Sequence, residues 1–357
     1  MKTPFAAEDP RPHLLDLQPA ELRQWLSQVG QPSFRCTQIL SWVMQRRVAS
    51  FADMSDLPKK LREQLEAHFR LWTTSLAAHQ KSEDGTEKLL LQLADGGRIE
   101  CVLLREEGRR SICVSSQVGC AMGCVFCASG LDGVLRNLTT GEIIEQMLLL
   151  ARQLEPQERL SHIVVMGMGE PLANIDALLP ALEMASRADG LGISPRRITI
   201  STVGLPPAMR KLTERNTRYR LAVSLHAPND ELRSELVPVN RSIGLQAILA
   251  EADAYFAASG RQLTFEYVLL ADINDRAEHA HQLANLLVRR EALLNVIPYN
   301  PVAGLPYRTP SAANQRTFRE ILESRGVRVK FRHRKGDAID AACGQLRRSN
   351  RTGVGGP

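Results

Sequence analysis

The sequence lacks several features that would place the protein in a membrane or outside the cell. No apolar run in its 357 residues is long enough to span a bilayer. The N-terminus is polar and contains prolines, so it does not have the pattern of a signal peptide. We therefore expect a cytoplasmic protein without a membrane partner. In a reducing compartment, its seven cysteines indicate metal binding or catalysis rather than a disulfide framework.

The sequence also lacks a fourth metal ligand to accompany three closely spaced cysteines. These are Cys120, Cys124 and Cys127, which follow a C-x3-C-x2-C spacing. No histidine lies between Gln80 and Leu160, and no second pair with metal-ligand spacing occurs in the chain. A structural zinc site needs a fourth protein ligand, so zinc is the less favoured interpretation. Three thiolates on one loop can instead bind three irons of a [4Fe-4S] cluster. The fourth iron would then be open to a small molecule such as S-adenosylmethionine (SAM), as in radical enzymes.

The charge balance is basic, with 45 Lys and Arg against 39 Asp and Glu and a formal net charge of +6. A polyanionic partner such as RNA suits this charge but is not required by it. The segment Val327–Arg334 alternates strictly and predicts an edge strand with one basic face. A second basic group lies in the expected N-terminal helices, at Arg46, Arg47, Lys59, Lys60 and Arg62. Each group indicates phosphate contact, with an ordinary solvated face as the alternative.

The first third of the chain predicts a small helical domain followed by a hairpin. Residues 1–12 are expected to be disordered. Residues 13–75 are expected to be helical, because apolar residues recur at helical spacing in Ala20–Val29, Ser33–Arg46 and Leu57–Phe69. Residues 76–105 are expected to form a linker and a β-hairpin. Glu100 lies among apolar neighbours in the second strand, so burial would raise the pKa of its carboxyl group and suit a proton acceptor. The alternative is a rim carboxylate without a role.

From Ser111 onward, short apolar strands alternate with amphipathic helices, which predicts a parallel sheet covered by helices. Six such repeats without a G-x-G-x-x-G fingerprint favour an α/β fold with a partial (βα)6 TIM-like barrel over residues 106–335. Ligands bind such barrels at the C-terminal ends of the strands. The expected strands are 111–116, 162–166, 197–201, 220–225, 263–269 and 293–298, and the expected helices are 141–154, 175–188, 206–215, 245–258, 276–290 and 312–324.

Candidate ligand-binding residues lie at or just after the ends of several of these strands. They are Gly169, Glu170, Ser201, Ser224, Leu225, His226 and Asn300. Glycines allow a ligand to approach the backbone closely, and hydroxyl and amide groups can bind a ribose or a carboxylate. The final segment, residues 336–357, is expected to be a mobile tail that carries Cys343 among small residues. An incidental thiol is the alternative interpretation of that cysteine.

Four segments together give the chain a resemblance to a known family. They are CVSSQVGCAMGCVFC, MGMGEPL, SLHAPND and IDAACGQLR, and the similarity extends from about Glu21 to Arg347. The resemblance is to the RlmN family, radical SAM enzymes that methylate carbon 2 of an adenosine in 23S rRNA and, in many members, in tRNA. One alternative is a Cfr-type enzyme that methylates carbon 8. A less favoured alternative is a non-enzymatic RNA-binding module stapled by zinc.

The resemblance implies a role for each candidate residue. Cys120, Cys124 and Cys127 would hold the cluster, and the strand-end residues Gly169 to Asn300 named above would bind SAM. Cys343 would carry the methyl group, Cys113 would resolve the protein–RNA adduct, and Glu100 or Cys113 would remove the carbon 2 proton. Two SAM molecules would be used per turnover, and the resolution step would leave a transient disulfide. A flavodoxin or ferredoxin would supply the electron, and we expect the enzyme to act as a monomer.

Overall fold

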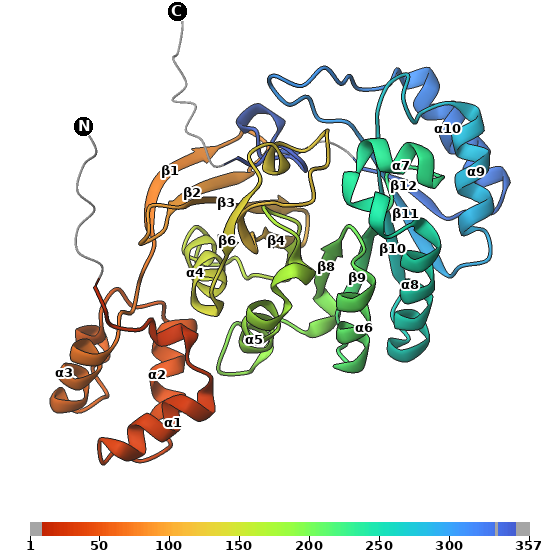
Figure 1. Ribbon diagram of the computed structural model, residues 1–357. Helices are drawn as coiled ribbons and strands as arrows, with labels where there is room; N and C mark the ends of the chain where they lie inside the picture. The colour runs from red at the N-terminus through yellow and green to blue at the C-terminus, as the bar shows by residue number, and fades with distance from the viewer. Residues whose placement is uncertain (1–8, 333–334, 348–357) are drawn as a thin grey trace, which may run out of the picture.

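The computed structural model describes residues 9–332 and 335–347, as a large α/β body with a small helical lobe at one side (Figure 1). The lobe contains α1 (Pro19–Gln28), α2 (Arg35–Met44) and α3 (Lys59–His68), which confirms the three expected helices; α1 begins and ends one residue earlier than expected, and α2 and α3 are slightly shorter. Proline suits the first position of α1, because its fixed φ is helical and its missing N–H would have no partner there. The apolar faces of the three helices form one core, including Leu22, Leu26, Ile39, Leu40, Val43, Leu61 and Leu65. Most of the segment expected to be disordered lies outside the described residues.

A buried carboxylate attaches this lobe to the main body. Glu145, which is 0% exposed, lies in α4 (Thr140–Ala151), and its Oε1 is 3.0 Å from Nε2 of His13. The same carboxylate accepts hydrogen bonds from the backbone amides of Thr73 (2.5 Å) and Thr74 (2.9 Å). Because a buried carboxylate needs such partners, this network joins both ends of the lobe to the barrel.

The main body contains a ten-stranded sheet that begins with an antiparallel extension. Its first strands are β1 (Ser75–Lys81), β2 (Glu87–Gln92) and β3 (Arg98–Glu106), and β3 pairs antiparallel with β4 (Arg109–Cys113). The expected hairpin is therefore present, and β1 is added to it. No apolar alternation marks β1, since its seven residues are exposed or half-buried. Its pairing with β2 places it in the sheet.

Seven parallel strands form the partial barrel, which confirms the expected fold class. After β4 come β7 (His162–Val165), β8 (Ile198–Thr202), β9 (Arg220–Ser224), β10 (Leu263–Leu269), β11 (Ala292–Pro298) and the edge strand β12 (Val329–Phe331). The expected edge strand Val327–Arg334 is shorter than predicted, and His333 and Arg334 lie outside the described residues. The barrel is open because its two end strands do not pair with each other in the described sheet: β4 lies between β3 and β7, and β12 pairs with β11.

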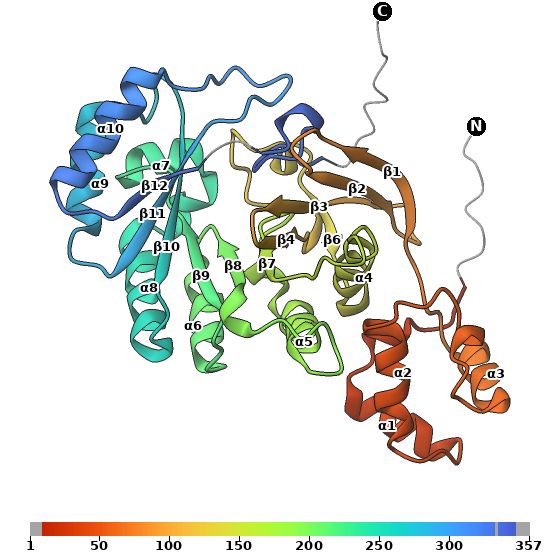
Figure 2. The ribbon, with the colours of Figure 1, turned by 180° about the vertical axis from the view of Figure 1, so that it is seen from behind.

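Helices cover the outer face of this sheet, as both ribbon views show (Figures 1 and 2). A capping box formed by Thr139 and Glu142 opens α4, where Thr139 Oγ1 accepts the amide of Glu142. The helices after α4 are α5 (Ile175–Ser186), α6 (Pro206–Glu214), α7 (Asp230–Leu236), α8 (Leu245–Ser259), α9 (Ala277–Leu287) and α10 (Ala312–Ser324). The short α7 was not expected; it interrupts the long loop between β9 and α8. None of the helices found in the described chain has the length and apolarity to cross a bilayer.

Candidate active site

A pocket opens at the C-terminal ends of the parallel strands, where the fold predicts ligand binding. Its empty volume is about 910 Å³ with the open mouth included, which is enough for a nucleotide-sized cofactor. The lining brings together nearly all residues that the sequence singled out. They are the cysteines Cys120, Cys124, Cys127 and Cys343, and the strand-end residues Gly169, Glu170, Ser201, Ser224, His226 and Asn300.

The three-cysteine loop lies at one wall of this pocket. It leaves β5 (Gln117–Gly119), which pairs with β6 (Val134–Asn137), and the amide of Cys120 donates to the carbonyl of Gly133 (3.0 Å). The turn is closed by the amide of Cys127, which donates to the carbonyl of Cys124 (3.1 Å). Gly123 has a φ of +67°, a conformation that glycine adopts without strain.

The chemistry of this loop fits an iron–sulfur cluster. Burial raises the pKa of the Cys120 thiol to about 12, so bound iron is the natural source of the positive charge that thiolates need. No group of three His, Cys, Asp or Glu side chains in residues 9–332 and 335–347 is arranged around a single metal ion. A cubane requires a different arrangement, because each of its cysteines binds a different iron.

The loop after β7 contains Gly169 and Glu170. Gly169 has a φ of +105°, and a Cβ there would lie 2.7 Å from Ser116 Oγ, so the position requires glycine. The carboxylate of Glu170 accepts hydrogen bonds from the Thr202 hydroxyl (2.7 Å) and from the Val203 amide (2.8 Å). Although Glu170 lines the pocket, its carboxylate therefore joins the loops that follow β7 and β8. Burial raises its pKa.

Three buried polar atoms near the pocket have no partner among the described residues: Ser116 Oγ, Glu266 Oε2 and Asn300 Oδ1. Glu266 and Asn300 both line the pocket. Since buried polar atoms are normally hydrogen-bonded, they indicate a polar ligand with donor groups, and SAM has an ammonium group and ribose hydroxyls. Glu266 is not among the residues that the sequence pattern predicts for the site. The only signal was a single acid within the otherwise uncharged strand β10.

The strand end after β9 holds His226 in a left-handed conformation, with a φ of +61°. Its Nδ1 accepts the amide of Val268 (3.1 Å), so Nε2 carries the proton of the neutral ring. Burial, with the charge of Arg233 as a smaller cause, lowers the pKa of His226 to about 3. Leu225 is fully buried and does not line the pocket; its carbonyl accepts a hydrogen bond from Arg233 (3.0 Å).

The C-terminal tail places Cys343 at the pocket. The amide of Ala128, next to the three-cysteine loop, donates to the carbonyl of Gly344 (2.8 Å). Asn300 Nδ2 donates to the carbonyl of Cys343 (3.1 Å), and Ser129 Oγ donates to the carbonyl of Leu346 (2.8 Å). The segment that carries the tail cysteine therefore docks on the loop that carries Cys120, Cys124 and Cys127.

Cys113 lies beside this tail at the end of β4. It is buried and does not line the pocket, and burial raises the pKa of its thiol to about 12, with Cys343 as a further cause. Arg332 Nη1 lies 3.9 Å from Cys343 Sγ. The expected basic face of the edge strand is therefore interrupted, because Arg332 turns toward the thiols while Arg328 and Lys330 are exposed.

Glu100 lies in an adjoining, more polar pocket between the antiparallel extension and the tail. Its Oε1 is 3.0 Å from Nζ of Lys88, and its Oε2 accepts the backbone amide of Arg347 (2.7 Å). Burial raises its pKa, as the sequence indicated, and the charge of Lys88 opposes that shift. The structure thus places Glu100 beside the tail rather than among the residues that line the main pocket.

Comparison with known proteins identifies the family. The family model described as "Ribosomal RNA large subunit methyltransferase N-terminal domain" matches residues 12–71, and the Radical SAM superfamily model matches residues 114–284. A probable dual-specificity RNA methyltransferase RlmN from Rhodopirellula baltica is 66% identical over 94% of this chain and 91% of that protein. Its Bacillus subtilis counterpart is 43% identical over 96% of this chain and 94% of its own.

A solved structure agrees with these relatives. The crystal structure of a radical SAM methyltransferase from Sphaerobacter thermophilus superposes with a TM-score of 0.92 and is 40% identical, covering 95% of this chain and 100% of that one. These similarities do not favour the alternative of a Cfr-type enzyme. The chain belongs to the RlmN family of radical SAM RNA methyltransferases.

Proposed function

We propose that this enzyme methylates carbon 2 of an adenosine in 23S rRNA and in tRNA, with Cys343 as the carrier of the methyl group. One observation carries the proposal: Cys343 lines the same pocket as Cys120, Cys124 and Cys127. Carbon 2 of adenine is electrophilic, so a direct nucleophilic attack on SAM by that carbon is chemically unsuitable. A methyl group held on sulfur beside a radical source avoids this difficulty.

The residues of the pocket suit the cofactors of a radical SAM enzyme. Cys120, Cys124 and Cys127 would hold the [4Fe-4S] cluster, and Glu266 and Asn300 offer unpaired acceptors for polar groups of SAM. When bound, the cluster and two SAM molecules per turnover supply the methyl group and the radical that activates it. Gly169, Glu170, Ser201, Ser224, Leu225 and His226 would shape the rest of the SAM site through backbone and side-chain groups.

The two thiols Cys343 and Cys113 have successive tasks. The Cys343 sulfur would first accept a methyl group and would then be joined to the base through the methylene carbon. The thiolate of Cys113 would attack that sulfur, forming a disulfide while the bond between sulfur and the methylene carbon breaks. The electron pair stays with the methylene carbon, which takes a proton and becomes the new methyl group. Arg332 near Cys343 Sγ adds positive charge where a thiolate must form.

Proton removal from carbon 2 is assigned to Glu100, with the Cys113 thiolate as the other candidate. The ion pair with Lys88 favours the ionised form of Glu100, the form that accepts a proton. The backbone of Glu100 is also fixed to the segment that follows β4, because Ser115 Oγ donates to its carbonyl (2.6 Å). This carboxylate is therefore held rigidly next to the segment that carries Cys343.

The RNA must present an unstacked adenine, which costs a few kcal/mol and is easiest in loops. Exposed cations at Arg328 and Lys330 of the barrel edge, and at Lys59 and Lys60 of the helical lobe, offer contacts to phosphates. We further propose a cytoplasmic monomer that receives its electron from a flavodoxin or ferredoxin.

Mass spectrometry of nucleosides from RNA treated with the reconstituted enzyme tests the proposal. We expect 2-methyladenosine from both 23S rRNA and tRNA, and no methylation by Cys343→Ala. Formation of 8-methyladenosine would instead identify a Cfr-type reaction. Full activity of Cys343→Ala would remove this cysteine from the mechanism.

A further inference from the structure

Lys88 and Glu100 form a buried ion pair on the antiparallel extension. They belong to the neighbouring strands β2 and β3, in which Lys88 pairs with Val102 and Leu90 pairs with Glu100, so the two side chains are diagonal neighbours. Their charged atoms are 3.0 Å apart, and the residues are 6% and 7% exposed. Lysine and glutamate are rarely buried to this extent unless they are paired.

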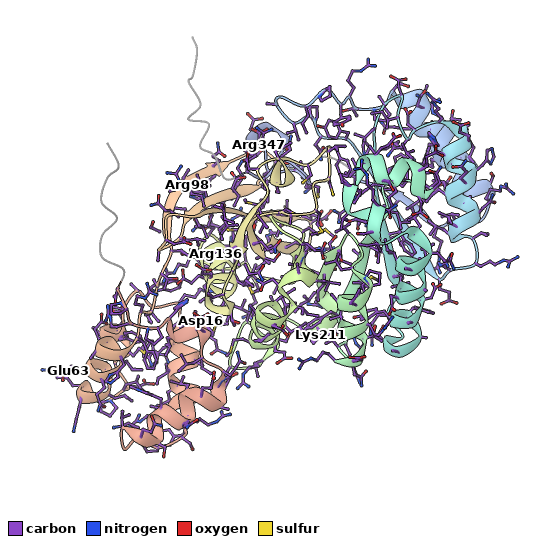
Figure 3. All side chains as sticks on the ribbon, viewed as in Figure 1. Asp16, Glu63, Arg98, Arg136, Lys211 and Arg347 are labelled. Carbon is purple, nitrogen blue, oxygen red and sulfur yellow. The ribbon has the colours of Figure 1, made fainter. Side chains whose placement is uncertain are left out.

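Each member of the pair also binds the tail, on either side of Cys343. Nζ of Lys88 donates to the carbonyl of Asp340 (3.1 Å), and Oε2 of Glu100 accepts the amide of Arg347 (2.7 Å). In both ribbon views the tail lies against strands β1–β3 (Figures 1 and 2), and Arg347 is labelled beside them in Figure 3. Two buried charges thus hold the two ends of an eight-residue segment, Asp340–Arg347, whose centre reaches the pocket.

We propose that Lys88 is a positioning residue of the methyl-transfer reaction. By binding both Asp340 and Glu100, Lys88 closes the tail over the pocket. The proposal rests on the proposed function, because that function gives Cys343 its task. The charge of Lys88 is needed at two points. It binds the carbonyl at the start of the segment, and it keeps Glu100 ionised, which makes the carboxylate a stronger acceptor for the Arg347 amide. Bonds to Ala128 and Asn300 hold the centre of the segment, and the Lys88–Glu100 pair holds its ends.

Hydrogen exchange of the tail in the anaerobically reconstituted holoenzyme is the direct test. In Lys88→Met, we expect the amides of Ala341 and Arg347 to exchange about tenfold faster or more, since a buried charge loses its partner. Lys88→Arg keeps the charge and should restore slow exchange. Lys81→Met serves as the matched control, because Lys81 lies on the neighbouring strand β1 with its side chain 65% exposed. Unchanged exchange in a folded Lys88→Met enzyme would overturn the proposal.

The pH dependence of methylation gives a readout that loss of folding stability alone would not move. The groups that act on the pKa of Glu100 are Lys88 from β2 and Asp340 and Arg347 from the tail. The charge of Lys88 lowers this pKa. Lys88→Met should therefore move the acidic limb of the rate profile to higher pH, whereas Lys81→Met should not. An unmoved limb would contradict the role of Lys88 toward Glu100.

The two readouts separate this proposal from the proposed function. Hydrogen exchange at the tail does not require RNA methylation. Faster tail exchange in Lys88→Met, together with a wild-type enzyme that forms no 2-methyladenosine, would overturn the proposed function and leave the role of Lys88 in holding the tail. If the wild-type enzyme forms 2-methyladenosine but tail exchange is equal in all variants, the proposed function stands and the role of Lys88 is overturned. If Lys88→Met does not fold, Lys88→Gln carries the same measurements, because it keeps a donor but no charge.

Discussion

The side-chain amide of Asn300 donates a hydrogen bond to the backbone carbonyl of Cys343, with Nδ2 and O separated by 3.1 Å. This bond connects a residue after the strand β11 with the tail, although the two residues are 43 positions apart in the chain. The other amide atom, Oδ1, is buried and has no partner in the described structure. Asn300 is therefore placed to contact a ligand and the tail at the same time.

We expect Asn300→Ala to slow RNA methylation by about tenfold to a hundredfold, because one substitution removes a ligand contact and a tail contact. Both a weaker affinity for SAM, measured by equilibrium dialysis, and a faster exchange of the tail amides should accompany the loss. Asn314→Ala is the control, since Asn314 lies in α10 and bonds Asp275 away from the pocket. Wild-type values for Asn300→Ala in both assays would show that this bond is incidental.

The resolving role proposed for Cys113 predicts a trapped adduct. Without this thiol, the carbon–sulfur bond between Cys343 and the base should remain unbroken. Cys113→Ala should therefore accumulate RNA covalently attached to protein, visible as a shifted band in denaturing gels. Cys36→Ala, which changes a cysteine in the core of the helical lobe, should turn over without an adduct. Clean turnover by Cys113→Ala would assign resolution to another group.

Because His226 is buried in its neutral form, we expect the free energy of unfolding to fall at acidic pH. Its pKa is about 3 in the folded chain and about 6.5 when unfolded, so the unfolded chain binds the extra proton first. A lowered pKa means that the stability present above pH 6.5 is lost as pH falls toward 3, at up to about 1.4 kcal/mol per pH unit. His226→Asn keeps an acceptor for Val268 and tolerates the left-handed backbone, and it should flatten this dependence.

Urea unfolding of the cluster-free protein between pH 7 and pH 5 measures the effect of His226→Asn. His281→Asn, at an exposed position of α9, is the control and should retain the wild-type slope. A wild-type slope in His226→Asn as well would show that another group causes the acid loss.

At the junction between the lobe and the barrel, Gly141 packs so closely against His13 that a larger residue at this position should clash. A Cβ at Gly141 would lie 2.0 Å from Nδ1 of His13, although alanine is otherwise a good helix former. Gly141→Ala should therefore lower the free energy of unfolding by about 1–3 kcal/mol. The penalty should shrink in a His13→Ala background, as a double-mutant cycle by thermal unfolding would measure. Equal penalties in both backgrounds would place the strain elsewhere.

Much of the fold and of the candidate site was predictable because it depends on residues that are close together in the sequence. The spacing of Cys120, Cys124 and Cys127, the apolar strands and the helical periodicities each depend on neighbours in sequence. Most strand-end candidates converge on one pocket because parallel strands end at the same edge.

What could not be predicted depends on partners distant in sequence. Strand β1 forms through its pairing with β2 rather than through an apolar pattern of its own. Lys88 bonds a carbonyl 252 positions away, and Arg332 turns toward Cys343 instead of joining an exposed basic row. Glu266 was missed because one acid in a strand gives no sign of the direction of its carboxylate.

The central claim is that the methyl group passes through Cys343. Wild-type enzyme with a reconstituted cluster should be incubated with SAM labelled in its methyl group, and the peptide that contains Cys343 should be examined by mass spectrometry before and after reductant and RNA are added. We expect the label on Cys343 first and in 2-methyladenosine afterwards. Labelled RNA from an enzyme whose Cys343 never carries the label would contradict it.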